Sequence, residues 1–450
     1  MSTIVNPKSE IRNPKWVAGL PLPTGRAILL VALGVVAAGL WGWKGALVFD
    51  VGILLLCVLD FFLSRREGGI EVMRLCPSRL FQGVPADVEI LIRNHSPRSR
   101  RVKLRDQTPS GWEAGPVLRG AVRGRDSQRL SYRAIPPQRG AHAFGDFWLR
   151  VEGPLGAVLR PLRQPASEQI RVYPSLGVQA HGDLAAHRRA AREWGARPSR
   201  WRQEGREFES LRDYVEGDDP RRIHWKATAR MERPIVQQYE HERNQIVMIL
   251  LDAGRLMMAA SRGRSKLDHS LEAAVQLSRA ALAQGDRVGV MAFADEVMGF
   301  VPPRKTPGQL QRIMEGTLTL EPRLVEPQYE RAVLFLQARV RRRSLVVIFT
   351  DLLDEISSEA LLLAVSLLRP RHLPLCVAIA ESEWLDVLGE PPSTVVGVYE
   401  RTVLQGLLRQ RRKALGNLVQ KGALALDLPP SKLSACVLER YLEVKRRGLL

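Results

Sequence analysis

The chain has 450 residues, of which 45% are hydrophobic and 25% charged. This composition excludes disorder as the default, and the length favours two or three folded units over a single core. The formal net charge is +20, and residues 1–243 contribute most of it, with 39 Lys and Arg against 25 Asp and Glu. The four cysteines have no CxxC spacing, which excludes the zinc and redox motifs built on that spacing and suits a reducing compartment.

Two apolar runs near the N-terminus predict a helical hairpin in a membrane. Residues 27–43 carry no charge, and residues 45–63 carry only Asp50 and Asp60, each near an end of the run. Each run is about long enough to cross a ~30 Å hydrocarbon layer. We therefore predict two transmembrane helices within residues 27–63, with membrane lipid as a partner. A cleaved signal peptide is the alternative.

The distribution of positive charge predicts the orientation of this hairpin. Lys and Arg flank both of its outer ends, whereas the connection holds only Lys44. The positive-inside rule then places residues 1–26, both termini and the later domains in the cytoplasm. Anionic headgroups attract Lys and Arg near the surface by about 1 kcal/mol each, so the membrane is also the simplest explanation of the basic charge.

Residues 70–175 are expected to form a β-rich, sandwich-like domain. Short β-branched and aromatic runs alternate there with clusters of Pro, Gly, Asn and Ser, a pattern typical of an antiparallel sandwich or barrel. The expected strands are EVMRL, ADVEILIRN, RVKLRDQ, QRLSYRAIP, HAFGDFWLRVE and QIRVYP. Residues 176–204 are rich in Arg and lack an apolar period, so we expect a basic linker or arm.

From residue 244 the pattern changes to strands that alternate with helices. IVMILLD, DRVGVMAFAD, SLVVIFTD and LPLCVAIA are nearly continuous aliphatic runs, which is typical of parallel strands buried on both faces. Helical patterns occupy 267–284, 307–316, 329–340 and 357–368. Residues 244–382 are therefore expected to form a doubly wound α/β domain, and residues 383–450 to add the strand ALALDL and a basic C-terminal helix.

Polar side chains close two of these strands. Asp252 ends the first strand, and Thr350 and Asp351 follow the third. Ligands gather at the carboxyl ends of parallel strands, and Mg²⁺ prefers carboxylate and hydroxyl oxygens. Asp252, Thr350 and Asp351 are thus candidate ligands of Mg²⁺, the one cofactor considered. The alternative is that backbone N–H groups at helix starts satisfy the two acids.

A longer stretch, residues 205–243, resembles a known family. GREFESLRDYVEGDDPRRIHWKATARMERPIVQQYEHE is similar to the signature region of the bacterial domain-of-unknown-function 58 family, in which a von Willebrand factor A-like domain follows two membrane helices. RGAHAFGDFWLRVEGPLGAVLR, residues 139–160, also resembles that family. The resemblance implies that residues 244–382 are von Willebrand A-like and that the membrane is the bacterial inner membrane.

The candidate metal site departs from the pattern that this resemblance implies. The metal-ion-dependent adhesion site of such domains begins with Asp-x-Ser-x-Ser, but Gly254 and Leu256 stand at the two serine positions after Asp252. Arg255 adds a positive charge, which we expect to oppose a divalent cation. Residues 324–333 hold no threonine for the distal ligand. We therefore expect a degenerate site.

Within residues 205–243, charged side chains and an indole are close in sequence. GDDPRR has turn chemistry, and IHWKATAR alternates like a strand. We interpret the group as a clasp between domains with Trp225 buried, or as a partner surface. His224 beside two acids suggests acid–base chemistry, but it is more simply structural. The candidate residues are Tyr214, Gly217, Asp218, Asp219, Arg221, Arg222, His224, Trp225, Lys226 and Arg230.

These observations favour a membrane-anchored protein-binding adaptor or scaffold over an enzyme. A nucleophile elbow, an HExxH pair and a phosphate-binding Gly loop are all absent from the sequence. The family resemblance implies an AAA ATPase of the MoxR type as partner, because genes of the two kinds commonly occur together, and a role in assembly or metal insertion of another complex.

Two other classes of function stay open. One is a metal-dependent hydrolase at Asp252 and Asp351, although two-metal hydrolysis needs more ligands. The other is lipid or nucleic-acid binding through residues 188–206, where Arg alternates with Trp194 and Trp201. No recognised nucleic-acid module accompanies that arm, so nucleic acid is not the expected partner.

Overall fold

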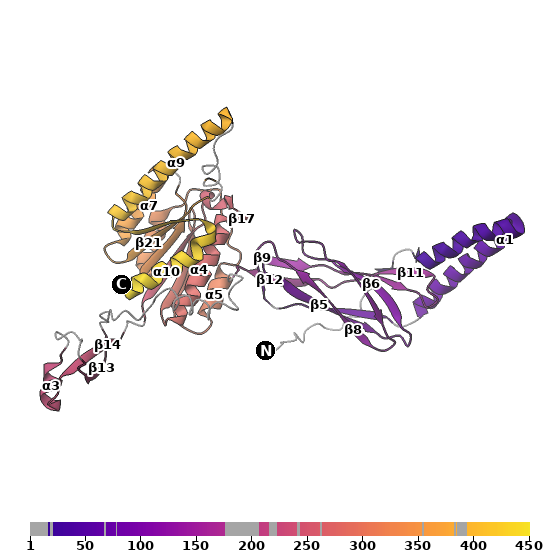
Figure 1. Cartoon of the computed structure of the whole chain (residues 1–450), viewed down its shortest axis with the longest axis horizontal. Coiled ribbons are helices and arrows are strands. Elements are labelled where there is room, and N and C mark those ends of the chain that lie inside the picture. The colour runs from indigo at the N-terminus through magenta and orange to yellow at the C-terminus, as the bar shows by residue number, and fades with distance from the viewer. Residues whose placement is uncertain are drawn as a thin grey trace. The chain divides into compact units, whose positions relative to one another are not determined.

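The computed structural model describes residues 17–18, 21–66, 69–77, 79–175, 207–215, 223–240, 244–261, 263–352, 355–381, 384 and 394–450 (Figure 1). The predicted basic linker, residues 176–204, lies outside this set, as do residues 1–16 and 19–20 of the predicted N-terminal segment. The chain divides into two compact units, Met1–Tyr173 and Pro174–Leu450.

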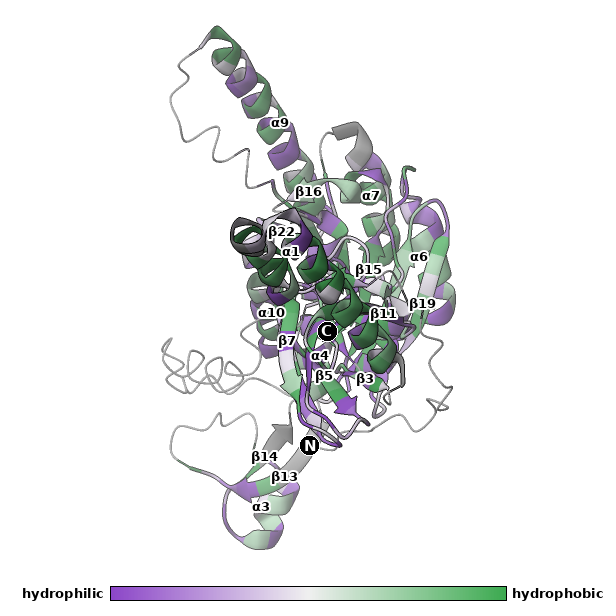
Figure 2. Ribbon diagram, turned by 90° about the vertical axis from the view of Figure 1, so that its right-hand side faces the viewer, coloured by the Kyte–Doolittle hydropathy of each residue, from purple (hydrophilic) through white to green (hydrophobic). Residues whose placement is uncertain are grey.

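The first unit begins with a helical hairpin, α1 (Gly25–Arg66). Non-helical dihedral angles at Trp41 (φ −125°, ψ 15°) and Gly42 (φ 69°, ψ −170°) break α1 into two helices, both largely apolar (Figure 2). Gly34 lets them approach closely, because a Cβ at this position would lie 2.8 Å from Asp50 Oδ1 on the second helix.

Within the part of the chain that the structure describes, one helix is long and apolar enough to cross a membrane. It is Trp41–Ser64, with 24 residues, whereas Gly25–Val36 is a shorter apolar helix. The expectation of an apolar hairpin is thus met. Of the two predicted spans, only the second reaches the usual length for a membrane-spanning helix.

Asp60, in the second helix, is buried and joins α1 to the β-rich part of the first unit. Its carboxylate accepts backbone hydrogen bonds from Leu155 N (2.7 Å), Ala157 N (2.8 Å) and Val158 N (2.9 Å). A Cβ at Gly153 would lie 2.4 Å from Asp60 Oδ2, so only glycine leaves room for the carboxylate. Asp60 therefore has a structural role in the first unit, where it fixes the second helix of α1 to the β10–β11 turn.

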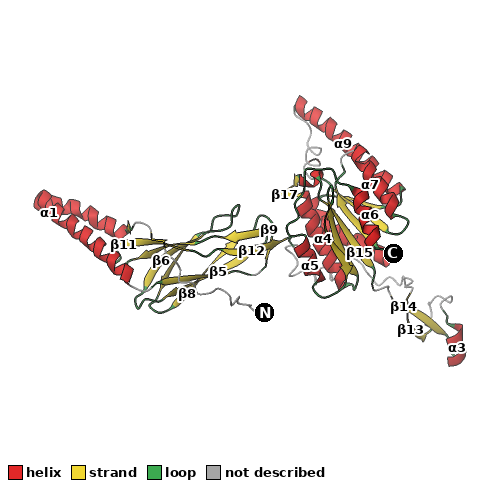
Figure 3. Cartoon of the chain, turned by 180° about the vertical axis from the view of Figure 1, so that it is seen from behind, coloured by secondary structure: helices red, strands yellow, loops and turns green. Residues whose placement is uncertain are grey.

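The rest of the first unit consists of mainly antiparallel sheets, which confirms the predicted β-rich domain (Figure 3). The first sheet contains β1 (Val17–Ala18), β2 (Leu22–Pro23), β6 (Arg100–Asp106), β7 (Val117–Val122), β10 (Phe147–Glu152) and β11 (Val158–Gln164). The second contains β3 (Ile70–Leu75), β5 (Ala86–Asn94) and β8 (Ser127–Ala134), and the third β4 (Leu80–Phe81), β9 (Gly140–Phe144) and β12 (Glu168–Tyr173). Ile90 of β5, Leu104 of β6 and Phe144 of β9 share one buried core, so the three sheets pack face against face.

The run HAFGDFWLRVE was predicted as one strand, but it forms two. β9 pairs with β12, whereas β10 pairs with β6 and β11 in another sheet. The chain changes sheet at Gly145, where a Cβ would lie 2.5 Å from Gln107 Cδ. Sequence alone also missed β7 and β11, because Gly120 and Pro161 weaken the strand pattern in each.

In the second unit a mixed sheet has the order β19-β18-β15-β20-β21-β22. All neighbouring strands in it are parallel except β19, which is antiparallel to β18 at one edge. The strands are β15 (Ile246–Asp252), β18 (Arg287–Phe293), β19 (Val297–Arg304), β20 (Leu345–Thr350), β21 (Leu373–Ile379) and β22 (Leu424–Leu428). The short elements η2 (Arg255–Met258), β16 (Ala260–Ser261) and β17 (Arg264–Ser265) follow β15.

Helices cover both faces of this sheet (Figure 3). Side chains of α4 (Lys266–Ala283), α5 (Gln309–Gly316) and α10 (Pro430–Arg446) contribute to the core on one face. Side chains of α6 (Tyr329–Arg339), α7 (Glu355–Leu368) and α9 (Val395–Gln420) contribute to the core on the other. This is the layered α/β arrangement that alternating strands and helices predict.

The predicted boundary at residue 382 does not separate two folded units. β22 pairs with β21 in the same sheet, and α10 packs against α4. The sequence prediction also missed α9 altogether. Its buried face carries Arg411 beside Ala414 and Leu418, and a buried charge breaks the apolar period by which a helix is recognised.

Residues 205–243, which resemble the family signature, contain the hairpin of β13 (Glu207–Asp213) and β14 (Ile235–Glu240). They also contain a short helix, α3 (Trp225–Met231). The prediction of a strand over IHWKATAR is wrong. His224 caps α3 by accepting a hydrogen bond from Ala227 N at Nδ1 (3.0 Å), and alanines favour helix. The predicted burial of Trp225 is also wrong, because 71% of this residue is exposed.

Candidate functional site

The ends of β15 and β20 meet at the carboxyl edge of the sheet, because these strands are parallel neighbours. Asp252 Oδ2 accepts hydrogen bonds from Thr350 Oγ1 (2.7 Å) and Tyr329 OH (2.9 Å), and Asp252 Oδ1 accepts one from Gly254 N (2.7 Å). Asp252, Thr350 and Tyr329 are all buried. The structure thus brings Asp252 and Thr350 together, as their positions in the sequence predict.

Burial raises the pKa of Asp252 to about 6, although its three hydrogen bonds oppose the shift. Between about pH 4, the ordinary value for Asp, and about pH 6, the folded chain holds a proton here that the unfolded chain has lost. The contribution of Asp252 to stability therefore falls as the pH rises through this window.

We expect Asp252→Asn to remove this dependence. The stability of the variant relative to the natural chain should increase by up to about 2–3 kcal/mol from about pH 4 to about pH 7. Unfolding curves of both proteins across this range measure the difference. A stability difference between the two proteins that is the same at every pH would contradict the expected titration of Asp252.

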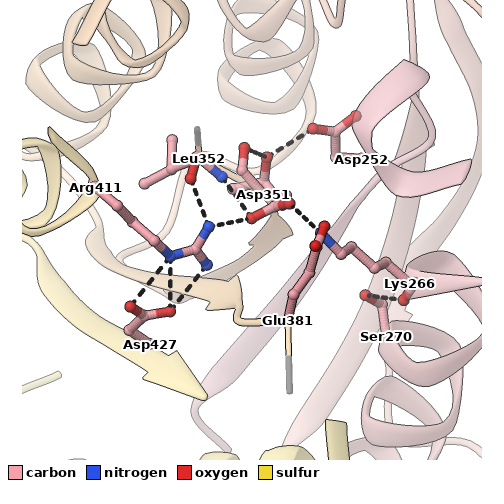
Figure 4. A network of polar contacts seen from close by, with 9 residues as sticks. Asp252, Lys266, Ser270, Asp351, Leu352, Glu381, Arg411 and Asp427 are labelled. Carbon is pink, nitrogen blue, oxygen red and sulfur yellow. Dashed lines mark hydrogen bonds and ion pairs between the residues drawn. The ribbon is translucent and has the colours of Figure 1, made fainter. Parts of the chain in front are cut away.

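Asp351 takes part in a network of charged side chains that adjoins Asp252 (Figure 4). Its Oδ2 accepts a hydrogen bond from Lys266 Nζ (2.6 Å), and its Oδ1 accepts bonds from Arg411 Nη1 (2.5 Å) and Leu352 N (2.8 Å). Lys266 also donates to Glu381 Oε1 (2.7 Å), and Arg411 Nη2 donates to Asp427 Oδ1 (2.9 Å). The network joins α4, β20, the end of β21, α9 and β22.

The charges of this network are shielded from water. The side chains of Lys266, Asp351 and Arg411 are all at most 2% exposed. Burial lowers the pKa of the Arg411 guanidinium, but Asp351 and Asp427 outweigh burial and the net shift is upward. The Arg411 guanidinium therefore stays positively charged beside Asp351.

The donor set does not fit a divalent cation. Both oxygens of Asp351 already contact cationic groups, and both oxygens of Asp252 accept hydrogen bonds. Among the described residues, no group of three or more His, Cys, Asp or Glu side chains could hold a metal ion. Mg²⁺ would have to displace Lys266 or Arg411 before it reached Asp351.

The glycine at the first of the two serine positions has a structural explanation of its own. A Cβ at Gly254 would lie 2.8 Å from Pro327 Cδ and 3.0 Å from Val325 O, so a serine there would displace the backbone. Arg255 forms an exposed ion pair with Glu326. Lys266 and Arg411 are the cationic groups that contact Asp351, so they add to the positive charge expected from Arg255.

Sequence reasoning missed five members of this edge, namely Tyr329, Lys266, Glu381, Arg411 and Asp427. Two of them had a usable signal: Glu381 directly follows the strand LPLCVAIA, and Tyr329 lies in residues 324–333, where the adhesion motif would place its distal threonine. Tyr329 contacts Asp252 instead. The others approach the site from distant helices and a strand, and no local pattern marks them.

The signature residues are described only in part. Gly217, Asp218, Asp219, Arg221 and Arg222 lie outside the described residues. Tyr214 N donates to Pro234 O (2.9 Å) and so joins the two strands of the hairpin. Trp225, Lys226 and Arg230 are exposed on α3. The cap formed by His224 supports its interpretation as a structural residue.

A family model described as "Protein of unknown function DUF58" matches residues 210–385. Uncharacterized proteins of Mycobacterium bovis and Mycobacterium tuberculosis are 28% identical over 180 residues, which is 39% of this chain and 56% of each relative. The chain thus spans about half the length of the curated relatives it matches. These matches support the resemblance to the domain-of-unknown-function 58 family over the central part of the chain.

Solved structures give weaker similarities. The conserved hypothetical protein BatB from Bacteroides thetaiotaomicron is 13% identical, with a TM-score of 0.32 over 45% of this chain and 98% of that one. A CARDB domain from Pyrococcus furiosus is 14% identical, with a TM-score of 0.18 over 24% of this chain and 90% of that one. Scores at this level carry no argument about fold or function.

Proposed function

We propose that this chain is a membrane-anchored adaptor that binds another protein through a von Willebrand A-like domain. In this proposal both helices of α1 span the bacterial inner membrane, and both termini and the soluble domains are cytoplasmic. The long apolar helix Trp41–Ser64, the match over residues 210–385 and the α/β sheet with helices on both faces support it.

The observation that carries the proposal is the exposed apolar surface on the N-terminal half of α9. The exposed fractions are 86% at Val395, 66% at Val396 and 73% at Tyr399. Val396 lies 18 residues, or about five helical turns, before the buried Ala414 and therefore on the same face of α9. Figure 1 shows α9 extending beyond the sheet. Grouped apolar side chains of this kind are typical of protein interaction sites.

The charge of α9 indicates the chemistry of the partner. The helix carries five Arg and Lys residues and one acid, Glu400. Arg411 is held by Asp351 and Asp427, and Arg409 and Arg412 are exposed on the same helix. A partner with an apolar groove and acidic rim would complement it. By resemblance to the family, we propose an AAA ATPase of the MoxR type that acts in the assembly or maturation of another complex.

A binding measurement with the purified components tests this function. We expect the full-length chain in detergent to bind a MoxR-type ATPase from the same organism in the presence of ATP and Mg²⁺. The double variant Val396→Asp with Tyr399→Asp should weaken binding by at least about tenfold, because it places charge in the apolar contact. Leu324→Asp, at an exposed apolar residue elsewhere in the unit, is the matched control and should bind normally.

Two results would count against the adaptor. If the natural chain does not bind the ATPase, the proposed partner is wrong. If both variants bind as tightly as the natural chain, α9 is not the contact surface. A hydrolase at Asp252 and Asp351 has less support, because Lys266 and Arg411 already engage Asp351. Lipid or nucleic-acid binding through residues 188–206 concerns residues outside the described set.

A further inference from the structure

The carboxyl edge of the sheet contains its own positive charge. Lys266 Nζ lies 2.6 Å from Asp351 Oδ2 and 2.7 Å from Glu381 Oε1, so the ammonium bridges the ends of β20 and β21. Arg411 Nη1 lies 2.5 Å from the other oxygen of Asp351. Together the two side chains bring two positive charges to the acid that follows β20. This is the charge that one divalent cation would bring.

We propose that Lys266, together with Arg411, permanently takes the place of a divalent cation at this edge. The carboxyl edge is therefore stable without metal. Carboxylates and a hydroxyl at adjoining strand ends form a set that favours Mg²⁺. Here the counter-charge is covalently part of the chain, and it comes from α4 on one face of the sheet and α9 on the other.

The backbone around Lys266 holds its ammonium in position. Ser265 caps α4 with a capping box, in which Ser265 and Asp268 bond to each other's backbone N–H groups. This fixes the first turn of the helix, and Ser270 Oγ donates to Lys266 O (3.0 Å). Because Lys266 is the first residue of α4, its side chain is directed by a fixed helix start. Burying an ammonium group carries a desolvation penalty, which ion pairing offsets. Asp351 and Glu381 provide the ion pairs for Lys266.

A metal-binding measurement on the full-length chain in detergent tests the proposal without any partner protein. After removal of metals with EDTA, Mn²⁺ serves as the probe, and bound Mn²⁺ is counted by electron paramagnetic resonance. We expect no stoichiometric site in the natural chain, and the same thermal midpoint in EDTA and in Mg²⁺. Lys266→Ser removes the ammonium and leaves space between Asp351 and Glu381. This variant should bind one Mn²⁺ per chain and gain thermal stability when Mn²⁺ is added.

Lys266→Met is the control, because it removes the charge but fills the space. It should bind no Mn²⁺. One Mn²⁺ per natural chain that is lost in Asp351→Asn would overturn the proposal. A folded Lys266→Ser protein that binds no Mn²⁺ would also overturn it. If Lys266→Ser does not fold, the natural chain still tests the proposal. A thermal midpoint of the natural chain that falls in EDTA and recovers in Mg²⁺ would contradict a metal-free edge. None of these readouts depends on whether the chain is an adaptor.

Discussion

Asp351→Asn is expected to destabilise the second unit by about 3–5 kcal/mol, the usual cost of removing one partner from a buried ion pair. The amide keeps the shape of the side chain but removes the charge that Lys266 and Arg411 share. Each basic group would retain one acid, Glu381 or Asp427. Denaturant unfolding of the full-length protein in detergent measures the loss.

An exposed ion pair is the matched control for this prediction. Arg255 and Glu326 form an ion pair with both side chains about half exposed, so Arg255→Ala should change stability by only about 0–1 kcal/mol. Adding Lys266→Met to Asp351→Asn should recover part of the loss, because it removes a buried charge that has lost one of its two acidic partners. If Asp351→Asn costs no more than Arg255→Ala, the network does not stabilise the fold.

The sequence predicted the parts of the fold that depend on local patterns. The strands IVMILLD, SLVVIFTD and LPLCVAIA correspond to β15, β20 and β21, because buried parallel strands are continuous aliphatic runs. Local patterns gave the wrong secondary structure where contacts with other parts of the chain determine it. IHWKATAR alternates like a strand, but the His224 cap and its alanines make it a helix. The run HAFGDFWLRVE divides between two sheets at a glycine that no alternation pattern marks.

The sequence predicted only those residues of the candidate site that lie at the carboxyl ends of strands. Asp252 and Thr350 were expected together because parallel strands end at one edge, and they share a hydrogen bond. The partners of Asp351 could not be found in this way. Arg411 is 60 residues distant in sequence, and α9, which carries it, was itself missed. A site that helices complete from both faces of a sheet becomes visible only when the topology is known.

Asp60→Ala is expected to have the second large effect, at the joint between α1 and the sheet of β10 and β11. The carboxylate accepts three backbone N–H bonds, and each bond to a charged group contributes about 1.5–3 kcal/mol. We expect a loss of at least about 3 kcal/mol, together with faster hydrogen exchange at residues 155–158. Thermal unfolding and hydrogen exchange of the full-length protein in detergent measure the two effects.

The matched control is Asp50→Ala, because Asp50 is the other acid of α1 and is exposed. It should leave hydrogen exchange at residues 155–158 unchanged. Gly153→Ala attacks the same joint from the other side, since its Cβ would lie within 2.6 Å of three atoms of the Asp60 carboxylate. Its effect should match that of Asp60→Ala, and the double variant should be little worse than either, because both changes break one contact. Additive effects of Asp60→Ala and Gly153→Ala would show that the turn and the helix are stabilised independently, and that α1 is not fixed to the β-rich domain through Asp60.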